Sequence, residues 1–281
     1  MLNQLIADKS ATEAAPIRKY LRPGKRFPTV WCPGCGIGTV FGSIIRTIDR
    51  LGLIKDDVAM VSGIGCTGRM PVYADLATMH TTHGRALAFA TGLKLAQPHM
   101  KVVVVMGDGD AVGIGGNHFL HAARRNMDLI AIIVNNSIYG MTGGQCSPST
   151  PFSARTTTSA HGNIDNPLDI AKVAEAAGAN FVARGTTYHV VALGKLMEQA
   201  FLKNGFSVIE VISQCPVHFG KLNGSPSPVE MLKWRRDNTV HVKAQDGSEN
   251  ASKIVRGVLV ERDQPGFVER YRRMITCGRE G

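Results

Sequence analysis

The stretch that decides the fold is "KVVVVMGDGDAVGIGGNHF", residues 101–119, in which an apolar run ends at Gly107 and is followed at once by Asp108. A near-continuous apolar run is typical of a strand that is covered on both faces, as in parallel sheets. Glycines at 107, 109, 113, 115 and 116 leave room for backbone N–H groups to approach a phosphate. A helix beginning near Gly115 would add its positive end. The stretch therefore predicts a strand end, a carboxylate and a phosphate-binding turn.

The same pattern of strand and helix repeats along the chain. Helical spacing fits residues 38–52, 83–97, 115–126, 167–178 and 188–205, and strand-like runs occupy 57–63, 101–107, 129–136, 179–185 and 206–213. This alternation predicts an α/β fold with a mostly parallel sheet and helices on both faces. Ligands in such sheets bind beyond the carboxyl ends of the strands, here the loops after Ser62, Met106, Val134 and Ser213. The polar region 139–166 is long enough to be a functional loop.

Composition and charge suggest three segments. The chain has 281 residues, 44% of them hydrophobic, and suits one large domain, residues 29–220, with a leader (1–28) and a C-terminal extension (221–281). The extension is expected to be a Pro/Ser-rich linker followed by a basic tail. The two ends together carry +8 of the net charge of +10. This favours an acidic partner, although solvated tails would look the same.

Several classes of protein are disfavoured. Nucleic-acid binding is not expected, since the basic ends lack interleaved aromatics and no zinc-finger or helix-turn-helix spacing is present. No apolar run approaches the roughly 20 residues of a membrane span. The first ten residues contain an acid and no long apolar core, which makes a poor secretory signal. We therefore expect a cytoplasmic protein.

Two side chains at neighbouring strand ends predict a metal site. Asp108 and Asn136 follow consecutive apolar runs, and one crossover of this length brings the ends of two parallel strands side by side. Carboxylate and amide oxygens suit magnesium, which often completes its shell with phosphate oxygens. The pair therefore indicates a diphosphate held through Mg²⁺. A tight turn with a capping aspartate would explain "GDG" alone, but it does not explain the paired "NN" at this spacing.

Four of the six cysteines lie near the same predicted edge. Cys32 and Cys35 form a C-x-x-C pair, and Cys66 and Cys215 each follow a predicted strand. Since disulfides are disfavoured in a cytoplasmic chain, thiols in this arrangement indicate an iron–sulfur cluster or a structural zinc. Cys146, in the long polar loop, is a rival for the fourth ligand. Cys277 is expected to be an ordinary thiol.

The motifs taken together resemble a known family. "WCPGCGIG", "GIGCTGRMPVY", "THGRALAFATGLKLA", "GDGDAVGIGGNHFLHAARRN", "NNSIYGMTGGQ" and "QCP" occur in the order found in β subunits of the 2-oxoacid:ferredoxin oxidoreductases, and most resemble the 2-oxoglutarate branch. The resemblance covers about residues 28 to 220. It implies a thiamine diphosphate-binding fold of the diphosphate-binding kind.

The resemblance also implies specific site residues. It places the ligands of a 4Fe-4S cluster at Cys32, Cys35, Cys66 and Cys215, and those of Mg²⁺ at Asp108, Asn136 and the carbonyl of Ile138. It places thiamine diphosphate contacts at Ile64, Gly65, Cys66, Thr67, Gly109, Asp110, Gly140, Met141, Thr142, Gly143, Gly144 and Gln145. Gly143 and Gly144 would let backbone donors reach the diphosphate.

The implied activity is oxidative decarboxylation of 2-oxoglutarate. Coenzyme A takes the acyl group, carbon dioxide leaves, and electrons pass one at a time through the cluster to ferredoxin; such enzymes also run in reverse as reductive carboxylases. The glutamate that activates thiamine belongs in the family to a separate α subunit. The chain is therefore expected to be inactive alone and to assemble as α2β2. Its basic ends are expected to dock either acidic ferredoxin or the α subunit.

Two residues are candidates for the substrate pocket. Arg69, three residues after Cys66, is a candidate partner for the distal carboxylate of 2-oxoglutarate, with a structural arginine as the alternative. His83 is a candidate pocket residue, as is His80, although single histidines are often structural.

Three alternative functions remain open. The first is the same reaction on pyruvate, a branched-chain 2-oxoacid or indolepyruvate. The second is a zinc-bound scaffold or nucleic-acid-binding subunit in which the thiamine motif has lost its chemistry. The third is a cluster-free thiamine synthase or decarboxylase, which leaves the cysteines unexplained.

Overall fold

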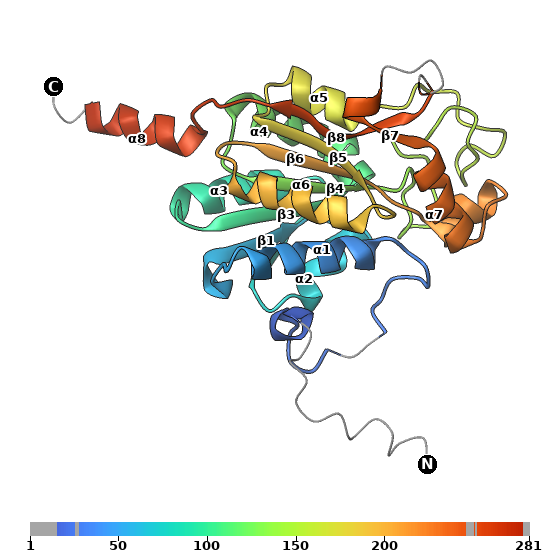
Figure 1. Cartoon of the computed structure of the whole chain (residues 1–281), viewed down its shortest axis with the longest axis horizontal. Helices are drawn as coiled ribbons and strands as arrows, with labels where there is room; N and C mark the ends of the chain where they lie inside the picture. Colours follow the sequence, from blue (N-terminus) through green and yellow to red (C-terminus); the bar gives the residue numbers. More distant parts are fainter. Residues whose placement is uncertain (1–15, 26–27, 246–249, 251, 278–281) are drawn as a thin grey trace, which may run out of the picture.

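The computed structural model describes residues 16–25, 28–245, 250 and 252–277. The described strands form one eight-stranded sheet with the order β2-β1-β3-β4-β6-β5-β8-β7 (Figure 1). Their bounds are β1 Val58–Ser62, β2 Ala77–His80, β3 Lys101–Gly107, β4 Ile130–Asn135, β5 Phe181–Thr186, β6 Ser207–Ile212, β7 Thr239–His241 and β8 Ile254–Glu261. The helices are α1 Ile37–Arg50, α2 Met70–Tyr73, α3 Ala86–Ala96, α4 Gly116–Arg125, α5 Ile170–Ala176, α6 Val190–Leu202, α7 Pro228–Asp237 and α8 Phe267–Cys277.

The sheet is mostly parallel, as the sequence predicts. Strands β2, β1, β3, β4, β6 and β5 pair in parallel, and among the described strands only β5 and β8 pair in the antiparallel direction. β7 then pairs with β8 in parallel. The described part of the chain therefore has the α/β architecture expected from the alternating pattern.

Helices cover both faces of the sheet and create two cores. α1 and α6 lie on one face, and α3, α4 and α5 lie on the other (Figure 1). Strand β3 contributes to both cores, because Val103 and Val105 point to the first and Val102 and Val104 to the second. This explains its unbroken apolar run: side chains alternate along a strand, so both faces of a covered strand are apolar.

The pairing of β3 with β4 positions the two predicted ligands. Gly107 pairs with Val134 in the parallel register, so Asp108 and Asn136 follow neighbouring strand ends. β1 and β6 flank this pair, and the loops after all four strands therefore meet at one edge. The chain after β3 first makes a short π-helical turn at Gly109–Gly113, and α4 begins at Gly116, close to the expected position.

The prediction of a linker and a basic tail after Gly220 is wrong over much of that segment. Residues 228–237 form α7, and β8 joins the main sheet beside β5. The apolar pattern of β8 is interrupted by Arg256 and Gly257, which hides the strand from a periodicity argument. The start of α7 did carry a helix signal, since Ser227 caps the helix by accepting from the Glu230 N–H and Pro228 occupies its first turn.

Other segments add detail that the sequence pattern missed. β2 is a short edge strand of four residues with no fully buried side chain, so its hydrophobic signal is weak. α8 extends away from the sheet (Figure 1).

Two predictions concern parts of the chain that are not described. Most of the predicted leader, residues 1–15, 26 and 27, and the side chain of Cys277 lie outside the described residues. Among the helices that are described, none has the length and apolar character needed to cross a membrane.

A buried ion-pair network ties three strands and a helix together. Arg184 of β5 donates from Nε to Glu210 of β6 at 2.7 Å and from Nη2 to Asp169 at 2.5 Å. Asp169 also caps α5 by accepting from the Lys172 N–H. Asn135 of β4 donates to the other oxygen of Glu210 at 2.7 Å. The buried arginine is therefore fully compensated within the chain.

Removing one charge of this network tests its contribution. We expect Glu210→Gln to lower the free energy of unfolding by about 3 kcal/mol, because it leaves a buried guanidinium with one charged partner fewer. The matched control is Glu198→Gln in the partly exposed Arg50–Glu198 pair, which should cost less than about 1 kcal/mol. Urea unfolding measures both variants. Equal losses of unfolding free energy in the two variants would show that burial of the network does not determine its contribution to stability.

Candidate functional site

The loops at the carboxyl edge of the sheet enclose a small cavity of about 100 Å³. It is lined by nine of the predicted thiamine contacts, namely Ile64, Gly65, Cys66, Thr67, Gly109, Asp110, Gly140, Met141 and Thr142. It is also lined by the three predicted magnesium ligands Asp108, Asn136 and Ile138, together with His83, Gly107 and Tyr139. The structure thus brings together residues that are separated by up to 78 positions in the sequence.

Asp108 is a buried carboxylate with neutral partners. It is 2% exposed, and the hydroxyls of Ser147 and Ser149 each donate to its Oδ2 at 2.6 Å. Burial raises the pKa of Asp108, and the two serine hydrogen bonds oppose this rise. No Lys, Arg or His among the described residues forms an ion pair with it. A cation at this carboxylate would offset the cost of burying its charge.

Two further oxygens at the cavity lack hydrogen-bond partners. Asn136 is 9% exposed, and its Oδ1 is buried with no partner among the described residues. Asp110 Oδ2 is also buried and has no hydrogen-bond partner among the described residues. Buried oxygens of this kind are expensive unless something satisfies them. One carboxylate, one amide oxygen and one carbonyl, completed by water and phosphate, fit Mg²⁺, so the residues present suit the predicted ion.

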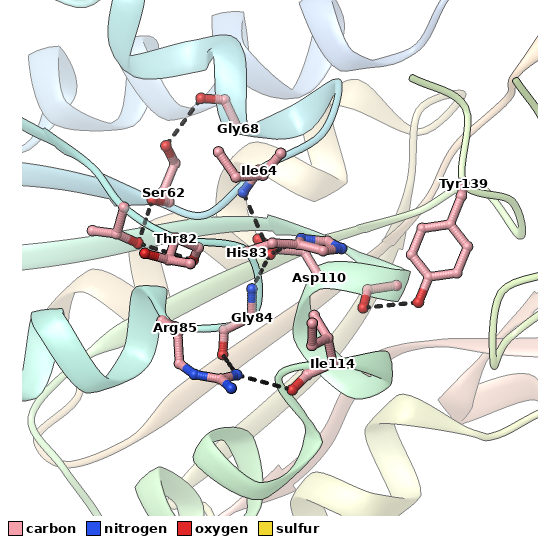
Figure 2. Close-up of polar contacts among 12 residues, drawn as sticks. Ser62, Ile64, Gly68, Thr82, His83, Gly84, Arg85, Asp110, Ile114 and Tyr139 are labelled. Carbon is pink, nitrogen blue, oxygen red and sulfur yellow. Dashed lines mark hydrogen bonds and ion pairs between the residues drawn. The ribbon is translucent and has the colours of Figure 1, made fainter. Parts of the chain in front are cut away.

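Asp110 connects three loops and orients His83 (Figure 2). Its Oδ1 accepts from the Gly84 N–H at 2.6 Å and the Ile64 N–H at 3.4 Å, and it lies 2.7 Å from His83 Nδ1. Burial raises the pKa of Asp110, while these donors lower it. When Asp110 is ionised it holds the proton of His83 on Nδ1, which leaves Nε2 as the free ring nitrogen.

A tyrosine that sequence reasoning missed fills the space beside Gly109. A Cβ at position 109 would lie 2.0 Å from Cε1 of Tyr139, whose hydroxyl donates to the Gly109 carbonyl at 3.3 Å. Figure 2 shows Tyr139 on the opposite side of Asp110 from Gly84, and its ring meets that of His83 edge-on, with centroids 6.2 Å apart. Gly109 is therefore required by the Tyr139 ring, in addition to any ligand.

The segment 140–145 forms a tight turn whose first three residues line the cavity. Gly143 and Gly144 adopt positive φ angles of 116° and 95°, which other residues rarely adopt. The turn is closed by the Tyr139 N–H donating to the Gln145 carbonyl, and the Gln145 amide donates to the Thr142 carbonyl at 2.8 Å. The predicted contacts Gly143, Gly144 and Gln145 belong to this turn but do not line the cavity.

Two of the four predicted cluster cysteines lie beside the same turn. Sγ atoms of Cys66 and Cys215 lie 3.6 and 3.8 Å from where a Cβ of Gly140 would stand. Burial raises the pKa of Cys35 to about 12, with further contributions from Cys215, Cys66 and Cys32. Burial likewise raises the pKa of Cys66 to about 11, with help from Cys215 and Cys32. The four thiols are therefore close enough to influence one another.

Cys146 stands apart from this group. Its thiol contacts the Ser147 carbonyl at 3.7 Å, and it is absent from the groups that raise the pKa of Cys35 or Cys66. No three His, Cys, Asp or Glu side chains in the described part of the chain converge on a single metal ion. A four-iron cluster is larger than one ion and is held by four separated thiolates, which fits this looser group.

Three further residues were either predicted for the substrate pocket or lie beside the turn. His218, which sequence reasoning missed, lies beside Gly144 and Gly140, with Nδ1 3.4 Å from the position of a Gly144 Cβ. His80 is engaged with the Ser62 hydroxyl at 2.9 Å. Arg69 ends the turn Thr67–Arg69, does not line the cavity, and its side chain has no hydrogen bond or ion pair with any described residue.

Comparisons with known proteins agree with this geometry. The family of thiamine pyrophosphate enzymes, C-terminal TPP binding domain, matches residues 63–211. The 2-oxoglutarate synthase subunit KorB of Methanocaldococcus jannaschii is 47% identical over 263 residues, which cover 92% of this chain and 97% of the relative. The same subunit of Archaeoglobus fulgidus is 54% identical over 219 residues, covering 78% of this chain and 79% of the relative.

A solved structure is also similar. It is the 2-oxoglutarate:ferredoxin oxidoreductase from Magnetococcus marinus with 2-oxoglutarate, coenzyme A and succinyl-CoA bound. The match has a TM-score of 0.84 at 29% sequence identity and covers 96% of this chain and 92% of that chain.

The raised pKa values of the thiols can be tested in the metal-free chain. Because the thiolate is the reactive form, alkylation of Cys66 by iodoacetamide should still rise close to tenfold between about pH 9 and pH 10, below its pKa of about 11. In urea the same cysteine should level off near its ordinary pKa of about 8.5. Peptide mass spectrometry measures both rates. A plateau by pH 9 in the folded chain would contradict the burial argument.

Proposed function

Because the chain belongs to the family of β subunits of 2-oxoglutarate synthases, we propose that it provides the diphosphate-binding half of the active site in a 2-oxoglutarate:ferredoxin oxidoreductase. The reaction converts 2-oxoglutarate and coenzyme A to succinyl-CoA and carbon dioxide, with ferredoxin as electron acceptor. The observation that carries the proposal is the cavity in which Asp108 and Asn136 lie beside the loop of Cys66.

Magnesium would be held by Asp108, Asn136 Oδ1 and the Ile138 carbonyl. The unsatisfied oxygen of Asn136 and the uncompensated carboxylate of Asp108 support this assignment. Ser147 and Ser149 orient the carboxylate, as hydrogen bonds around a metal ligand commonly do. The residues Ile64–Thr67, Gly109, Asp110 and Gly140–Gln145 would surround thiamine diphosphate, whose bound form supplies the electron sink for decarboxylation of a 2-oxoacid.

A 4Fe-4S cluster would be held by Cys32, Cys35, Cys66 and Cys215 and would accept electrons one at a time. The mutual influence of these thiols supports this set over one that includes Cys146. Gly65 and Cys66 are consecutive and both line the cavity, so the same short segment would contact both thiamine diphosphate and the cluster. The described cysteines are all free, in keeping with the cytoplasmic location expected from the sequence.

His83 and Arg69 are proposed to act on the substrate. The contact of His83 with Asp110 fixes the ring, so that Nε2 is the atom that would hold or move a proton at the cavity. Arg69 has no partner among the described residues and would pair with the distal carboxylate of 2-oxoglutarate.

The partner is an α subunit of the oxidoreductase complex, and we propose an α2β2 assembly. The described chain has a single α/β sheet and therefore needs the α subunit for the glutamate that activates thiamine. The basic ends of the chain are proposed to meet acidic ferredoxin or the α subunit.

The experiment that tests the function uses the complex with its α subunit, purified without oxygen. Ferredoxin reduction should require both coenzyme A and a 2-oxoacid, and 2-oxoglutarate should give a higher kcat/KM than pyruvate. Arg69→Leu should raise the KM for 2-oxoglutarate by about 10-fold or more, since a charge-assisted pair is lost, and leave the KM for pyruvate nearly unchanged. Equal effects on both acids would refute the assignment of Arg69, and absence of 2-oxoglutarate-dependent reduction would refute the function.

The cluster ligands are tested by two single substitutions. Cys215→Ala should abolish the brown colour and the iron content of the complex, because three thiolates remain for a cluster that needs four. Cys146→Ala is the matched control and should retain iron at the wild-type level. Anaerobic iron and sulfide analysis measures both, and iron loss in the Cys146 variant alone would reverse the assignment.

A further inference from the structure

A second and larger cavity adjoins the proposed thiamine cavity at Asn136. Its volume is about 420 Å³, and it is enclosed by the loop after β4, the end of β6 and helix α7. The two cavities share only Asn136 among their lining residues. Asn136 therefore lies between the cavity proposed for thiamine diphosphate and a cavity to which no ligand has yet been assigned.

Helix α7 places a buried arginine in the wall of this second cavity. Arg235 is 7% exposed, and its only hydrogen bonds within the described part of the chain go to carbonyl oxygens of Met231, at 2.5 Å, and of Ser213. Its Nε is buried and has no hydrogen-bond partner among the described residues. No Asp or Glu of the described chain pairs with it, and none lines the cavity.

A second buried arginine, Arg184, has the carboxylate partners that Arg235 lacks. Both arginines are buried to a similar extent, but Arg184 is paired with Glu210 and Asp169. Those carboxylates raise the pKa of Arg184, whereas burial alone lowers the pKa of Arg235 to about 10. Arg235 therefore remains a cation at neutral pH, without a counter-charge. A buried charge in this state is costly, and an anion in the cavity would remove the cost.

The rest of the wall is largely apolar. Phe219, Met231, Ile212 and Ile254 line the cavity, and Trp234, 49% exposed, stands beside Arg235 where the wall meets solvent. A ligand would therefore need an anionic end and an apolar body. A single negative charge balances one guanidinium, whereas a phosphate dianion would leave an excess charge buried.

We propose that this cavity is a binding site for a small monocarboxylate with an apolar body, with its carboxylate on Arg235 and its body against Trp234. The site lies outside the proposed thiamine cavity, and its occupant is not a substrate of the proposed reaction. Because Asn136 lines both cavities, the occupant would lie against this residue.

The test is calorimetric titration of the full chain, alone and in complex with the α subunit, with 1-naphthoate as probe. 1-Naphthalenemethanol, of nearly the same shape but neutral, measures the contribution of the charge. We expect naphthoate to bind at least 10-fold more tightly than the alcohol, in both preparations and also in the presence of saturating 2-oxoglutarate.

Neighbouring residues of α7 provide matched variants. Arg235→Met should weaken naphthoate binding by about 10- to 100-fold, whereas Arg236→Met removes the same charge from the exposed side and should leave it unchanged. Trp234→Ala should weaken binding about 10-fold by removing an apolar wall. Because Trp234 is half-exposed, this variant tests the site even if Arg235→Met fails to fold.

Several results would overturn the proposal. Failure of naphthoate to bind, equal binding of the alcohol, or equal losses in the Arg235 and Arg236 variants would show that the buried guanidinium is not a ligand. Competition by 2-oxoglutarate would assign the probe to the substrate pocket. Binding to the isolated chain but not to the complex would show that the α subunit occupies the cavity. None of these outcomes depends on enzymatic activity, so they are distinct from failure of the proposed reaction.

Discussion

The structure depends on one placement: a carboxylate held at the end of a fully covered strand, without a cation from the chain itself. The parallel register of β3 and β4 puts Asp108 beside the segment of Asn136, and both side chains are buried. Two serine hydroxyls reach Asp108 from the long polar loop, but hydroxyls are neutral and leave the charge in place. The proposed divalent ion would offset this charge and would also satisfy the oxygen of Asn136. Gly107, Gly109, Gly140 and Tyr139 line the same cavity as Asp108.

The buried charges of the described chain fall into two groups, those that are paired with an opposite charge and those that are not. Arg184, Glu210 and Asp169 satisfy one another within the sheet and cap a helix. The carboxylate of Asp108 and the guanidinium of Arg235 have no oppositely charged partner among the described residues. The first lines the smaller cavity and the second lines the larger one. A buried charge without a counter-charge is costly, and an ion or ligand of opposite charge would offset that cost.

The parallel core, and the meeting of Asp108 and Asn136 at one edge of the sheet, could be predicted from the sequence because both are encoded locally. An unbroken apolar run, a carboxylate after it and an amide after the next run predict the β3–β4 edge without knowledge of distant contacts. β8 and α7 were missed because Arg256 and Gly257 interrupt the strand pattern and the Pro/Ser-rich stretch before α7 resembles a linker. Tyr139, His218 and the serines that reach Asp108 were missed for another reason: their roles depend on how a loop folds back over the sheet edge.

The central claim is that Asp108 anchors a magnesium-bound diphosphate, and the most direct measurement is thiamine diphosphate binding by the complex with and without Mg²⁺. Calorimetry should show binding that requires the ion, and Asp108→Asn should weaken it by 100-fold or more, since the charged ligand of the metal is lost. Asp165→Asn, an exposed aspartate of the same polar loop, should bind as the wild type does. Tight binding without magnesium, or undiminished binding by the Asp108 variant, would contradict the account.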